Sequence, residues 1–496
     1  MAVHAYLACD LSGVIMSGTQ IQLGIFFAIS FAIALATWWH CRVPRTQNVE
    51  SSREYFLAGG SLNWIFVAGS ITLTNLSTDQ LVGMNGNQML LLAWWELAAV
   101  AGLVVLGYVF LPLYYKYECT TTTELLEKKF GADGAGLRVV IAILFLLGGL
   151  LIYLPIMLYT GALFMQSMFG LELPLIWIAA ALAAVGAAYA IFGGLRAVAV
   201  SDTYSGIGLL GFGLLIVVLS LQAINWDLSG IPAERLTLIG DSDSPIPWHT
   251  LLTGMIFIQI FYWSFNQTIT QRAMAAPNIR EARIGVFAAA AIRLLIIPPI
   301  IVLPGIVSYK LFGQVGDAAY GQIVAEVLPV WLSGAFAAFM AAAVLTSFNS
   351  ALNSAAALYV VDLHDKVFDT QKRVVLISSV MMIAAVLLAL TLVPLYSNAT
   401  SIINLVQQLN GLLSMPILSA FLLAIFWRGV SPWASLIAVV FGVIGYGYAS
   451  FYWNPVHYIH MMFLTLLFCL GLALLLNRLV FGRRAQLDLS DFRARH

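Results

Sequence analysis

The sequence predicts an all-α polytopic membrane protein, first of all from its composition. Hydrophobic residues make up 61% of the 496 positions and charged residues only 9%, whereas soluble domains carry about 25% charged residues. The 23 basic and 23 acidic side chains are too few to cover a soluble protein of this length. The lipid bilayer is therefore an expected partner. A formal net charge of zero gives no reason to expect a nucleic-acid partner, and we expect no obligate protein partner.

Apolar runs of membrane-spanning length are the second reason. A helix needs roughly 20 apolar residues to cross the bilayer, and the chain contains about thirteen such runs. No Lys or Arg precedes Arg42, so the first run lacks the basic region of a signal peptide and is expected to remain as a helix. The runs lie at approximately 21–41, 62–84, 90–115, 138–166, 172–192, 203–223, 250–270, 284–311, 328–360, 374–396, 400–427, 432–451 and 457–478.

The distribution of basic residues between the predicted loops supports this number of spans. With the N-terminus placed outside, almost all of the 23 Lys and Arg fall in inner loops or in the C-terminal tail, as the positive-inside rule requires. Only Arg235 and Lys310 fall in outer loops, and Arg293 lies within a span. We therefore expect an outer N-terminus and a cytoplasmic C-terminus in a plasma membrane, specifically a bacterial inner membrane.

Polar residues interrupt two of the predicted spans near mid-membrane. TLTNLSTDQ places Asn75 ~20 Å along the span 62–84, and FYWSFNQ places Tyr262 ~18 Å along 250–270, at 1.5 Å per residue. These spans are five apart and enter from opposite faces, so a repeat of five helices must be inverted relative to its copy. Interrupted helices at matching positions of inverted halves indicate the binding site of a secondary transporter. Alternatively, each is a kinked helix satisfied by Ser and Thr side chains.

Six stretches of the chain, in order, are typical of one family. They are REYFLAGGSLNW from Arg53, NLSTDQLVGMNG from Asn75, IFGGLRAVAVSD from Ile191, FYWSFNQTITQRAMAA from Phe261, AAAVLTSFNSALNSAA from Ala341 and NLVQQLNGLLSMPIL from Asn404. On these stretches the chain resembles the sodium/solute symporter family, and within it the bacterial sodium/sugar (galactose/glucose) cotransporters. The resemblance runs from Arg53 to Gly429.

This resemblance implies a leucine-transporter-type core of five plus five inverted helices, two of them discontinuous. The single transporter domain would comprise an extra N-terminal helix at 21–41, a first repeat at 62–223, a second repeat at 250–427, two C-terminal helices at 432–478 and a cytoplasmic tail at 479–496. It also implies a secondary active transporter, not an enzyme, that moves a hexose such as galactose or glucose into the cell with sodium by alternating access. A same-fold symporter for a polyol, a sialic-type sugar acid or an amino acid is the alternative.

A sugar presents many hydroxyl groups, so its site needs amides and a carboxylate, together with an aromatic face for its C–H side. The interrupted spans and their neighbours carry side chains of these types. Tyr262 is the expected aromatic gate toward the cytoplasm, with Trp263 beside it. By the resemblance, the expected solute-binding residues are Asn75, Gln80, Glu96, Gln259, Tyr262, Trp263, Arg293 and Gln407.

The chain departs from the bacterial sugar transporters at this site. Gln259 stands where they tend to have Asn, Arg293 where they have Lys, and Trp95 where they have Tyr, so the exact sugar is left open. A charge within a span suggests a function, and the guanidinium of Arg293 suits a carboxylate, either Glu96 or an acidic substrate. The alternative is a structural ion pair between Glu96 and Arg293 that joins two helices.

Sodium is the expected coupling ion. It binds oxygen atoms, and an unwound helix offers free carbonyls opposite the hydroxyls of a facing helix. Thr346 and Ser347 could instead bond back to their own helix. By the resemblance, the coupling sodium is held by Leu73, Leu76, Ala343, Thr346 and Ser347.

Some relatives have a second sodium, which here would lie near Asp202, Asn349 and Ser350. For Asp202 and Asp79 the alternative is capping of a helix N-terminus, which is a common use of an aspartate. The residues themselves do not decide between these interpretations.

Other signatures are missing from the sequence. A Walker loop and an H-E-x-x-H stretch are absent, which argues against an ATP-driven pump and a membrane metalloprotease. The four cysteines are scattered and form no C-x-x-C pair, so we interpret them as apolar fillers. A membrane enzyme or a channel is therefore the least favoured function.

Overall fold

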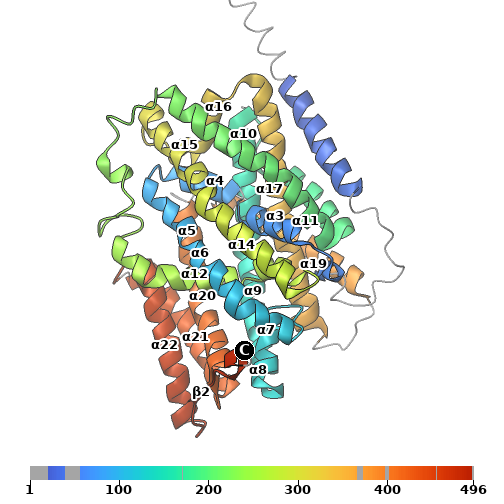
Figure 1. Ribbon diagram of the computed structural model, residues 1–496, viewed down its shortest axis with the longest axis vertical. Helices are drawn as coiled ribbons and strands as arrows, with labels where there is room; N and C mark the ends of the chain where they lie inside the picture. The colour runs from blue at the N-terminus through green and yellow to red at the C-terminus, as the bar shows by residue number, and fades with distance from the viewer. Residues whose placement is uncertain are drawn as a thin grey trace, which may run out of the picture.

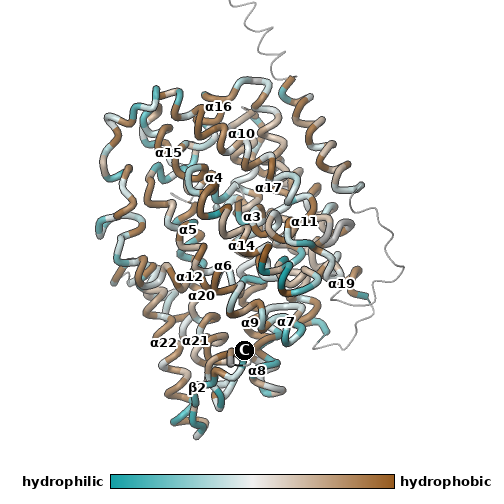
Figure 2. Tube along the Cα trace, viewed as in Figure 1, coloured by the Kyte–Doolittle hydropathy of each residue, from teal (hydrophilic) through white to brown (hydrophobic). Residues whose placement is uncertain are grey.

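The computed structural model describes residues 21–39, 56–76, 78–169, 171–365, 373–396, 402–453 and 455–493. In these ranges, ten helices are long and apolar enough to cross a membrane, beginning with Ile21–Trp39. Three shorter apolar helices bring the number to thirteen and fall on the predicted second, fifth and seventh spans: Trp64–Asn75, Leu175–Ile191 and Gly254–Phe265. The helices form one bundle in which apolar residues predominate (Figures 1 and 2). The predicted all-α polytopic membrane protein is confirmed.

Two series of helices precede a C-terminal pair. The first series comprises α3 (Trp64–Asn75), α4 (Thr78–Gly86), α5 (Trp94–Leu97), α6 (Ala99–Val105), α7 (Leu111–Lys116), α8 (Glu124–Phe130), α9 (Ala135–Gly148), α10 (Leu154–Phe169) and α11 (Leu175–Ala223). The second comprises α12 (Gly254–Phe265), α13 (Gln267–Met274), α14 (Ile279–Leu295), α15 (Ile297–Phe312), α16 (Ala319–Val327), α17 (Val330–Ala357), α19 (Val374–Tyr396) and α20 (Ile402–Phe426). The last elements are β1 (Trp427–Arg428), α21 (Pro432–Tyr448), α22 (Tyr458–Leu479), β2 (Gln486–Leu487) and α23 (Ser490–Arg493).

The second predicted span is broken where its polar residues gather. α3 begins at a capping residue, Asn63, whose side chain accepts the N–H groups of Ile65 and Phe66 at 3.1 and 3.2 Å. It ends at Asn75, because Leu76 has a non-helical ψ of 74°. The chain resumes as α4 at Thr78. The first of the two predicted discontinuous helices is confirmed.

The seventh predicted span is broken at Asn266. This residue has an extended ψ of 119°, and its side chain accepts the N–H of Thr268 at 2.9 Å. Asn266 therefore ends α12 and caps α13, which is the role that an asparagine at a helix start most often has. The FYWSFNQ stretch thus contains the second predicted break.

The fifth and sixth predicted spans form one run of 49 helical residues, α11. A straight helix of this length would measure ~74 Å, far more than the ~30 Å hydrocarbon layer. The hydroxyl of Tyr189 donates to the carbonyl of Ala197 at 3.1 Å, although eight residues of straight helix would separate them by ~12 Å along the axis. α11 is therefore bent between its two apolar stretches, Leu175–Ile191 and Ala197–Ala223.

The C-terminal segment folds back onto the end of α20. β2 pairs antiparallel with β1, with Trp427 opposite Leu487. Asp491 in α23 accepts hydrogen bonds from Lys116 at 2.7 Å and from Lys129 at 2.6 Å. Burial raises the pKa of the Asp491 carboxyl, but these hydrogen bonds outweigh burial and lower the pKa to about 2. The carboxylate therefore stays charged and holds the segment against α7 and α8.

A proline in α15 is matched by a polar side chain from α4. Pro304 has no N–H to give to the carbonyl of Ile300, four residues earlier. Asn85 donates to that carbonyl at 3.3 Å and accepts the N–H of Gly305 at 2.7 Å. A Cβ at Gly305 would lie 2.3 Å from the Asn85 carbonyl oxygen, so only glycine allows this approach. These two hydrogen bonds of Asn85 fix α4 against α15.

Asn85→Ala is expected to lower the free energy of unfolding by about 1–3 kcal/mol, because it leaves two buried backbone groups without a partner. The loss should be smaller in a Pro304→Ala background, where position 304 regains an N–H for the Ile300 carbonyl. Heat-induced loss of monodisperse protein in detergent measures the effect. Asn87→Ala is the matched control, because the Asn87 amide bonds only within its own helix turn, to the Gly83 carbonyl at 3.1 Å. Equal losses for the two asparagines would contradict the assignment.

Candidate functional site

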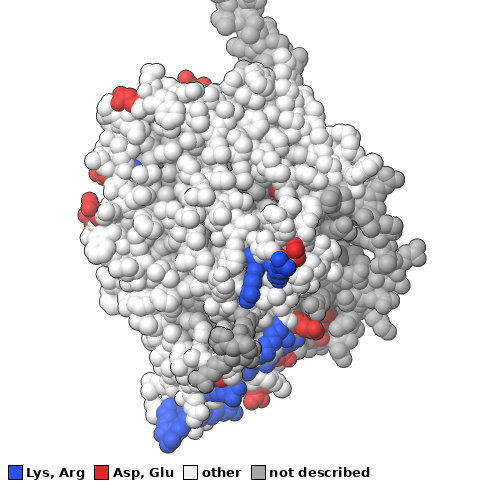
Figure 3. All heavy atoms as spheres, viewed as in Figure 1, with Lys and Arg blue, Asp and Glu red and all other residues white. Residues whose placement is uncertain are grey.

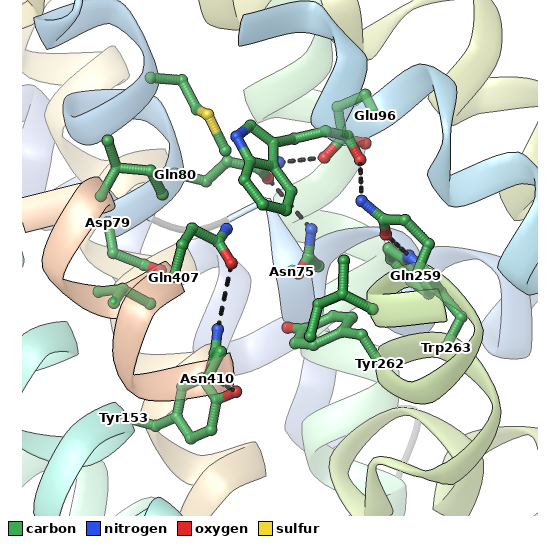
Figure 4. A pocket seen from close by; sticks show the side chains of 15 residues that line it. Asn75, Asp79, Gln80, Glu96, Tyr153, Gln259, Tyr262, Trp263, Gln407 and Asn410 are labelled. Carbon is green, nitrogen blue, oxygen red and sulfur yellow. Dashed lines mark hydrogen bonds between the residues drawn. The ribbon is translucent and has the colours of Figure 1, made fainter. Parts of the chain in front are cut away.

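A cavity of about 70 Å³ lies between the two helix breaks. Polar side chains from α3, α4, α5, α12 and α20 converge on it (Figure 4). Seven of the eight predicted solute residues line it, and the eighth, Arg293, lies behind Glu96. The lining residues are Asn75, Asp79, Gln80, Met84, Trp95, Glu96, Tyr153, Ile258, Gln259, Tyr262, Trp263, Ile403, Val406, Gln407 and Asn410.

Glu96 joins the cavity to the buried charge behind it. One carboxylate oxygen accepts from the Gln80 amide and the other from Nη1 of Arg293. The second nitrogen of Arg293, Nη2, donates to the carbonyl of Thr72 at 3.0 Å, near the end of α3. Both charged side chains are buried. Of the two partners considered for Arg293, the structure pairs it with Glu96, so the charge that faces the cavity is already compensated.

The Arg293 guanidinium also covers an aromatic ring of α12. Its Cζ lies 4.3 Å from the ring centroid of Trp263, a favourable cation–π distance. Trp263 Nε1 donates to Gln259 Oε1 at 2.9 Å, and Gln259 Nε2 donates to the Trp95 carbonyl at 2.8 Å. Gly102 of α6 makes room, because a Cβ there would lie 2.4 Å from the Gln259 carbonyl oxygen. Gln259 is therefore bonded at both ends within the cavity wall.

Asn75 lies at the end of α3, between Arg293 and Tyr262. In one orientation its amide donates to Gln80 Oε1 at 3.3 Å. In the opposite orientation the oxygen accepts from Arg293 Nη1 at 2.9 Å and Nη2 at 3.1 Å, and the nitrogen donates to the Tyr262 hydroxyl at 2.6 Å. The second orientation satisfies more partners, which is the basis for assigning an amide. Asn75 thus connects the first helix break to the aromatic wall of α12.

Three polar lining residues were not among the predicted solute residues. Asp79 lies in the first turn of α4, as its capping interpretation expects, and it also lines the cavity. Asn410 follows Gln407 by one helical turn, a spacing that puts the two on one face, and its Nδ2 donates to Gln407 Oε1 at 3.4 Å. That spacing could have identified Asn410. Tyr153 lies within an apolar run, where no pattern marks it.

The predicted coupling-sodium residues are brought together from α3 and α17. Ser347 Oγ donates to the carbonyl of Leu73 at 3.3 Å, across the two helices. Thr346 Oγ1 donates to the carbonyl of Ala343 at 3.2 Å, within its own helix. Leu76 directly follows the last residue of α3, so the carbonyls after Thr72 lack the N–H donors of a further helical turn. The oxygens are of the type that sodium binds.

Asp202 lies inside α11 and not at a helix end, so its interpretation as an N-terminal cap is wrong. Its Oδ2 accepts from Ser70 Oγ at 2.6 Å and lies 4.0 Å from Nε of Arg272. Arg272 was counted among the inner-loop residues, but the structure buries it completely in α13. It donates to Ser70 at 2.8 Å and also to Ser350. The sequence therefore did not predict that a buried charge lies near Asp202.

Unsatisfied polar atoms remain around this second group. Oδ1 of Asp202 and both amide atoms of Asn349 are buried and find no hydrogen-bond partner among the described residues. Buried polar atoms are almost always paired, so each such atom calls for an explanation. A cation would satisfy the Asp202 oxygen, whereas the amide nitrogen of Asn349 would still need an acceptor.

Comparison with known proteins gives a family. Residues 55–442 match the model of the Sodium:solute symporter family. The chain is 31% identical over 483 residues to the uncharacterized symporter YidK of Escherichia coli (strain K12), covering 92% of this chain and 83% of that one. It is 28% identical over 481 residues to a sodium/glucose cotransporter of Vibrio parahaemolyticus, covering 89% and 87% of the two chains.

One solved structure has a closely similar backbone. It is a substrate-bound, outward-open Na⁺-coupled sialic acid symporter, with a TM-score of 0.79 and 17% sequence identity. The superposition covers 92% of this chain and 98% of that one. At this identity the similarity shows the fold alone, and it confirms the predicted leucine-transporter-type core.

Glu96→Gln is expected to lower the free energy of unfolding by about 3–5 kcal/mol, because it leaves the buried Arg293 cation without its carboxylate. The double variant Glu96→Gln, Arg293→Met should recover most of this loss, since no unpaired charge remains. Thermal stability of the purified protein in detergent measures both. Glu172→Gln, at an exposed position, is the control. Equal melting temperatures for the Glu96 and Glu172 variants would show that the ion pair does not stabilise the fold.

Proposed function

We propose that this chain, which belongs to the sodium:solute symporter family, carries a hexose such as galactose or glucose into the cell by alternating access. Sodium-coupled solute symport follows from the family, so the chain is a secondary transporter and not an enzyme. The choice of solute is the proposal. The observation that carries it is a cavity rich in amides, in whose wall Glu96 is already paired with the buried cation Arg293 behind it.

The charges around the cavity favour a neutral solute over a sugar acid. A carboxylate on the solute would meet Asp79 and Glu96 in the cavity wall, and the guanidinium of Arg293 lies behind Glu96. Gln80 and Gln407 can exchange hydrogen bonds with hydroxyl groups, which both donate and accept. The rings of Tyr262 and Trp263, 5.3 Å apart and roughly perpendicular, offer apolar surface for the C–H face of a sugar. A cyclic polyol meets the same requirements and is the second candidate.

The proposed solute site consists of the eight predicted residues, with Arg293 acting through Glu96 rather than by contact. Seven of them face the cavity in the described part of the chain. Tyr262 is the proposed aromatic gate. Its hydroxyl accepts a hydrogen bond from the Asn75 amide nitrogen in the orientation in which the amide oxygen accepts from Arg293. Closure at Tyr262 would therefore be linked to the first helix break.

The proposed coupling-sodium site consists of the carbonyls of Leu73, Leu76 and Ala343 with the hydroxyls of Thr346 and Ser347. The hydrogen bond from Ser347 to the Leu73 carbonyl brings two of these oxygens within 3.3 Å. A cation between them would replace the hydroxyl proton as the partner of the carbonyl. Because α3 and α17 belong to different halves of the chain, sodium bound here would hold the halves together.

A second sodium is proposed beside the first, at Asp202, Asn349 and Ser350. The support is the unpaired Oδ1 of Asp202 and the unpaired amide of Asn349. The buried Arg272 next to Asp202 weakens this proposal, because it supplies a positive charge already and donates to Ser350. The first sodium site is therefore the one that we favour.

We propose that the end of the molecule with α7, α8 and the C-terminus faces the cytoplasm of a bacterial inner membrane. Basic side chains gather in the lower half of the view in Figure 3, whereas the charged side chains visible in the upper half are mainly acidic. Lys116, Lys128, Lys129 and Arg428 belong to this region. The arrangement follows the positive-inside rule and agrees with an outer N-terminus.

Purified protein in liposomes is expected to accumulate labelled galactose or glucose under an inward sodium gradient, and little under potassium or proton gradients. Competition by myo-inositol and by sialic acid tests the solute class: inositol should compete partially, and sialic acid should not compete. Gln407→Ala should raise the apparent KM about ten-fold through lost hydrogen bonds. Gln166→Ala is the matched control, because Gln166 donates to the Leu173 carbonyl outside the cavity. Uptake of sialic acid in place of hexose would overturn the proposed solute.

Thr346→Ala combined with Ser347→Ala should raise the sodium concentration for half-maximal uptake about ten-fold or more, because two ligands of the ion are removed. The solute concentration for half-maximal uptake, measured at saturating sodium, should change much less. Thr391→Ala in α19 is the control, since that hydroxyl also bonds back to its own helix, to Leu388 at 2.7 Å. An unchanged sodium dependence in the double variant would place the ion elsewhere.

A further inference from the structure

A second cavity lies directly beside the proposed solute cavity and shares two lining residues with it. These two residues, Tyr153 and Asn410, are the only ones common to both cavities in the described part of the chain. We call the second space the inner cavity. Its lining residues are Phe145, Gly148, Gly149, Ile152, Tyr153, Phe261, Asn266, Gln267, Thr268, Ala351, Ser354, Ala355, Leu358, Asn410 and Leu413.

Tyr153 and Asn410 are bonded to each other across this boundary. The Tyr153 hydroxyl donates to Asn410 Oδ1, and Asn410 Nδ2 donates to Gln407 Oε1 at 3.4 Å. In Figure 4 the two side chains lie together below Gln407. The pair comes from two segments that are far apart in sequence, the residue directly before α10 and the middle of α20. Their hydrogen bond therefore lies at the boundary that the two cavities share.

The inner cavity lies toward the end of the molecule that carries α8. Ala355 in its wall is on α17 beyond Thr346 and Ser347, and Leu358, also in the wall, directly follows the end of α17. Gln267, also in the wall, accepts the N–H of Thr122 at 2.8 Å, in the loop between α7 and α8. With that end in the cytoplasm, as proposed above, the inner cavity lies on the route by which solute leaves.

Tyr153 stands at a point where its helix is already distorted. Residues Gly149–Tyr153 form a wide π-helical turn between α9 and α10. Pro155 follows and has no N–H for the carbonyl of Leu151, to which the Tyr396 hydroxyl donates instead. Turns of this kind, next to glycines and a proline, are where helices bend. A small change at this turn would move the Tyr153 ring while α9 and α10 keep their own hydrogen bonds.

The proposed aromatic gate alone does not separate the two cavities. Tyr262 lines the solute cavity, and its neighbour Phe261 lines the inner cavity, so α12 forms a wall of both. Tyr153 and Asn410 are the lining residues that face both cavities. Movement of Tyr262 by itself would leave their hydrogen bond in place across the route.

We propose that the Tyr153–Asn410 hydrogen bond is an inner barrier to solute release, that it opens at the wide turn Gly149–Tyr153, and that the inner cavity is the space through which a neutral, polyhydroxylated solute then passes. The proposal rests on the proposed solute cavity. Its chemistry suits such a solute, because the amide of Asn410 and the hydroxyl of Tyr153 can exchange their mutual bond for bonds to solute hydroxyls. Both are therefore positioning residues for the passage of solute.

Cysteine accessibility tests this barrier without any solute present. Met84→Cys is placed in a functional background in which the four native cysteines are replaced, because Met84 lines the solute cavity and lies beyond the barrier as approached from the cytoplasm. A charged, impermeant thiol reagent is applied to the cytoplasmic face of inside-out vesicles. Tyr153→Phe and Asn410→Ala should each raise the rate of modification about five-fold, which corresponds to one net hydrogen bond. The double variant should exceed neither single variant by much, because both remove the same bond.

Two controls separate a barrier from general loosening. Tyr159→Phe, on α10 and outside both cavities, should leave the rate of modification of Met84→Cys from the cytoplasmic face unchanged. The same reagent applied from the outside to Met84→Cys, in the solute cavity, should react more slowly in the Tyr153 and Asn410 variants, because inward opening takes population from the outward-open state.

Unchanged modification of Met84→Cys from the cytoplasmic face in both well-folded variants would overturn the proposal. Faster modification of Met84→Cys from both faces would overturn it as well, since it would indicate a loosened fold. Because no solute is used, a different transported solute would leave the expected outcome intact, so the failure of the proposed function and the failure of this barrier remain distinguishable.

Discussion

The centre of this protein depends on one constraint, which is that a backbone group freed inside the membrane must find a partner other than water. Each interruption of a helix here is met by a side chain from another helix. Ser347 donates to the Leu73 carbonyl just before the first break. Tyr114 of α7 donates to the Ser264 carbonyl just before the second. Asn85 does the same for the kink in α15. Breaks that would weaken a single helix therefore tie neighbouring helices together, and they place polar atoms where a solute and an ion can use them.

The buried charges follow a common pattern. In the described part of the chain, three arginines are buried. With the proposed repeats at 62–223 and 250–427, each of them has a carboxylate partner in the other repeat, and Arg138 also pairs with Glu124 and Glu127 in its own. The pairs between the repeats are Arg138 with Asp362, Arg272 with Asp202, and Arg293 with Glu96. A buried pair stabilises weakly as a unit but is costly to separate, so these contacts favour rearrangements in which the paired helices move together.

Much of this arrangement could be predicted from the sequence, because a polar residue in an apolar span is conspicuous. The helix breaks, Glu96, and the amides of Gln80 and Gln407 stand out in this way. The partners of these residues could not be predicted, since pairing depends on how distant helices pack. Arg272 shows the difference: near a predicted span end it was assigned to a loop, whereas α13 continues and buries it.

Residues that look ordinary in sequence were the hardest to predict. Tyr153 lies in an apolar run, and its importance comes from the wide turn and from contact with a helix more than 250 positions later. The continuity of α11 was also missed, because two apolar stretches separated by glycines resemble two helices with a loop between them. Local pattern predicts an element well, but it does not reveal whether the chain bends or ends at a junction.

The C-terminal segment bears on how the protein can be handled. β2 and α23 are held to the body of the molecule by strand pairing with β1 and by the contacts of Asp491 with Lys116 and Lys129. Shortening the chain before Asp491 would leave two lysines without their counter-ion and expose the edge of β1. An affinity tag or a fluorescent reporter at this end would therefore sit beside a folded contact and is better joined through an extended spacer.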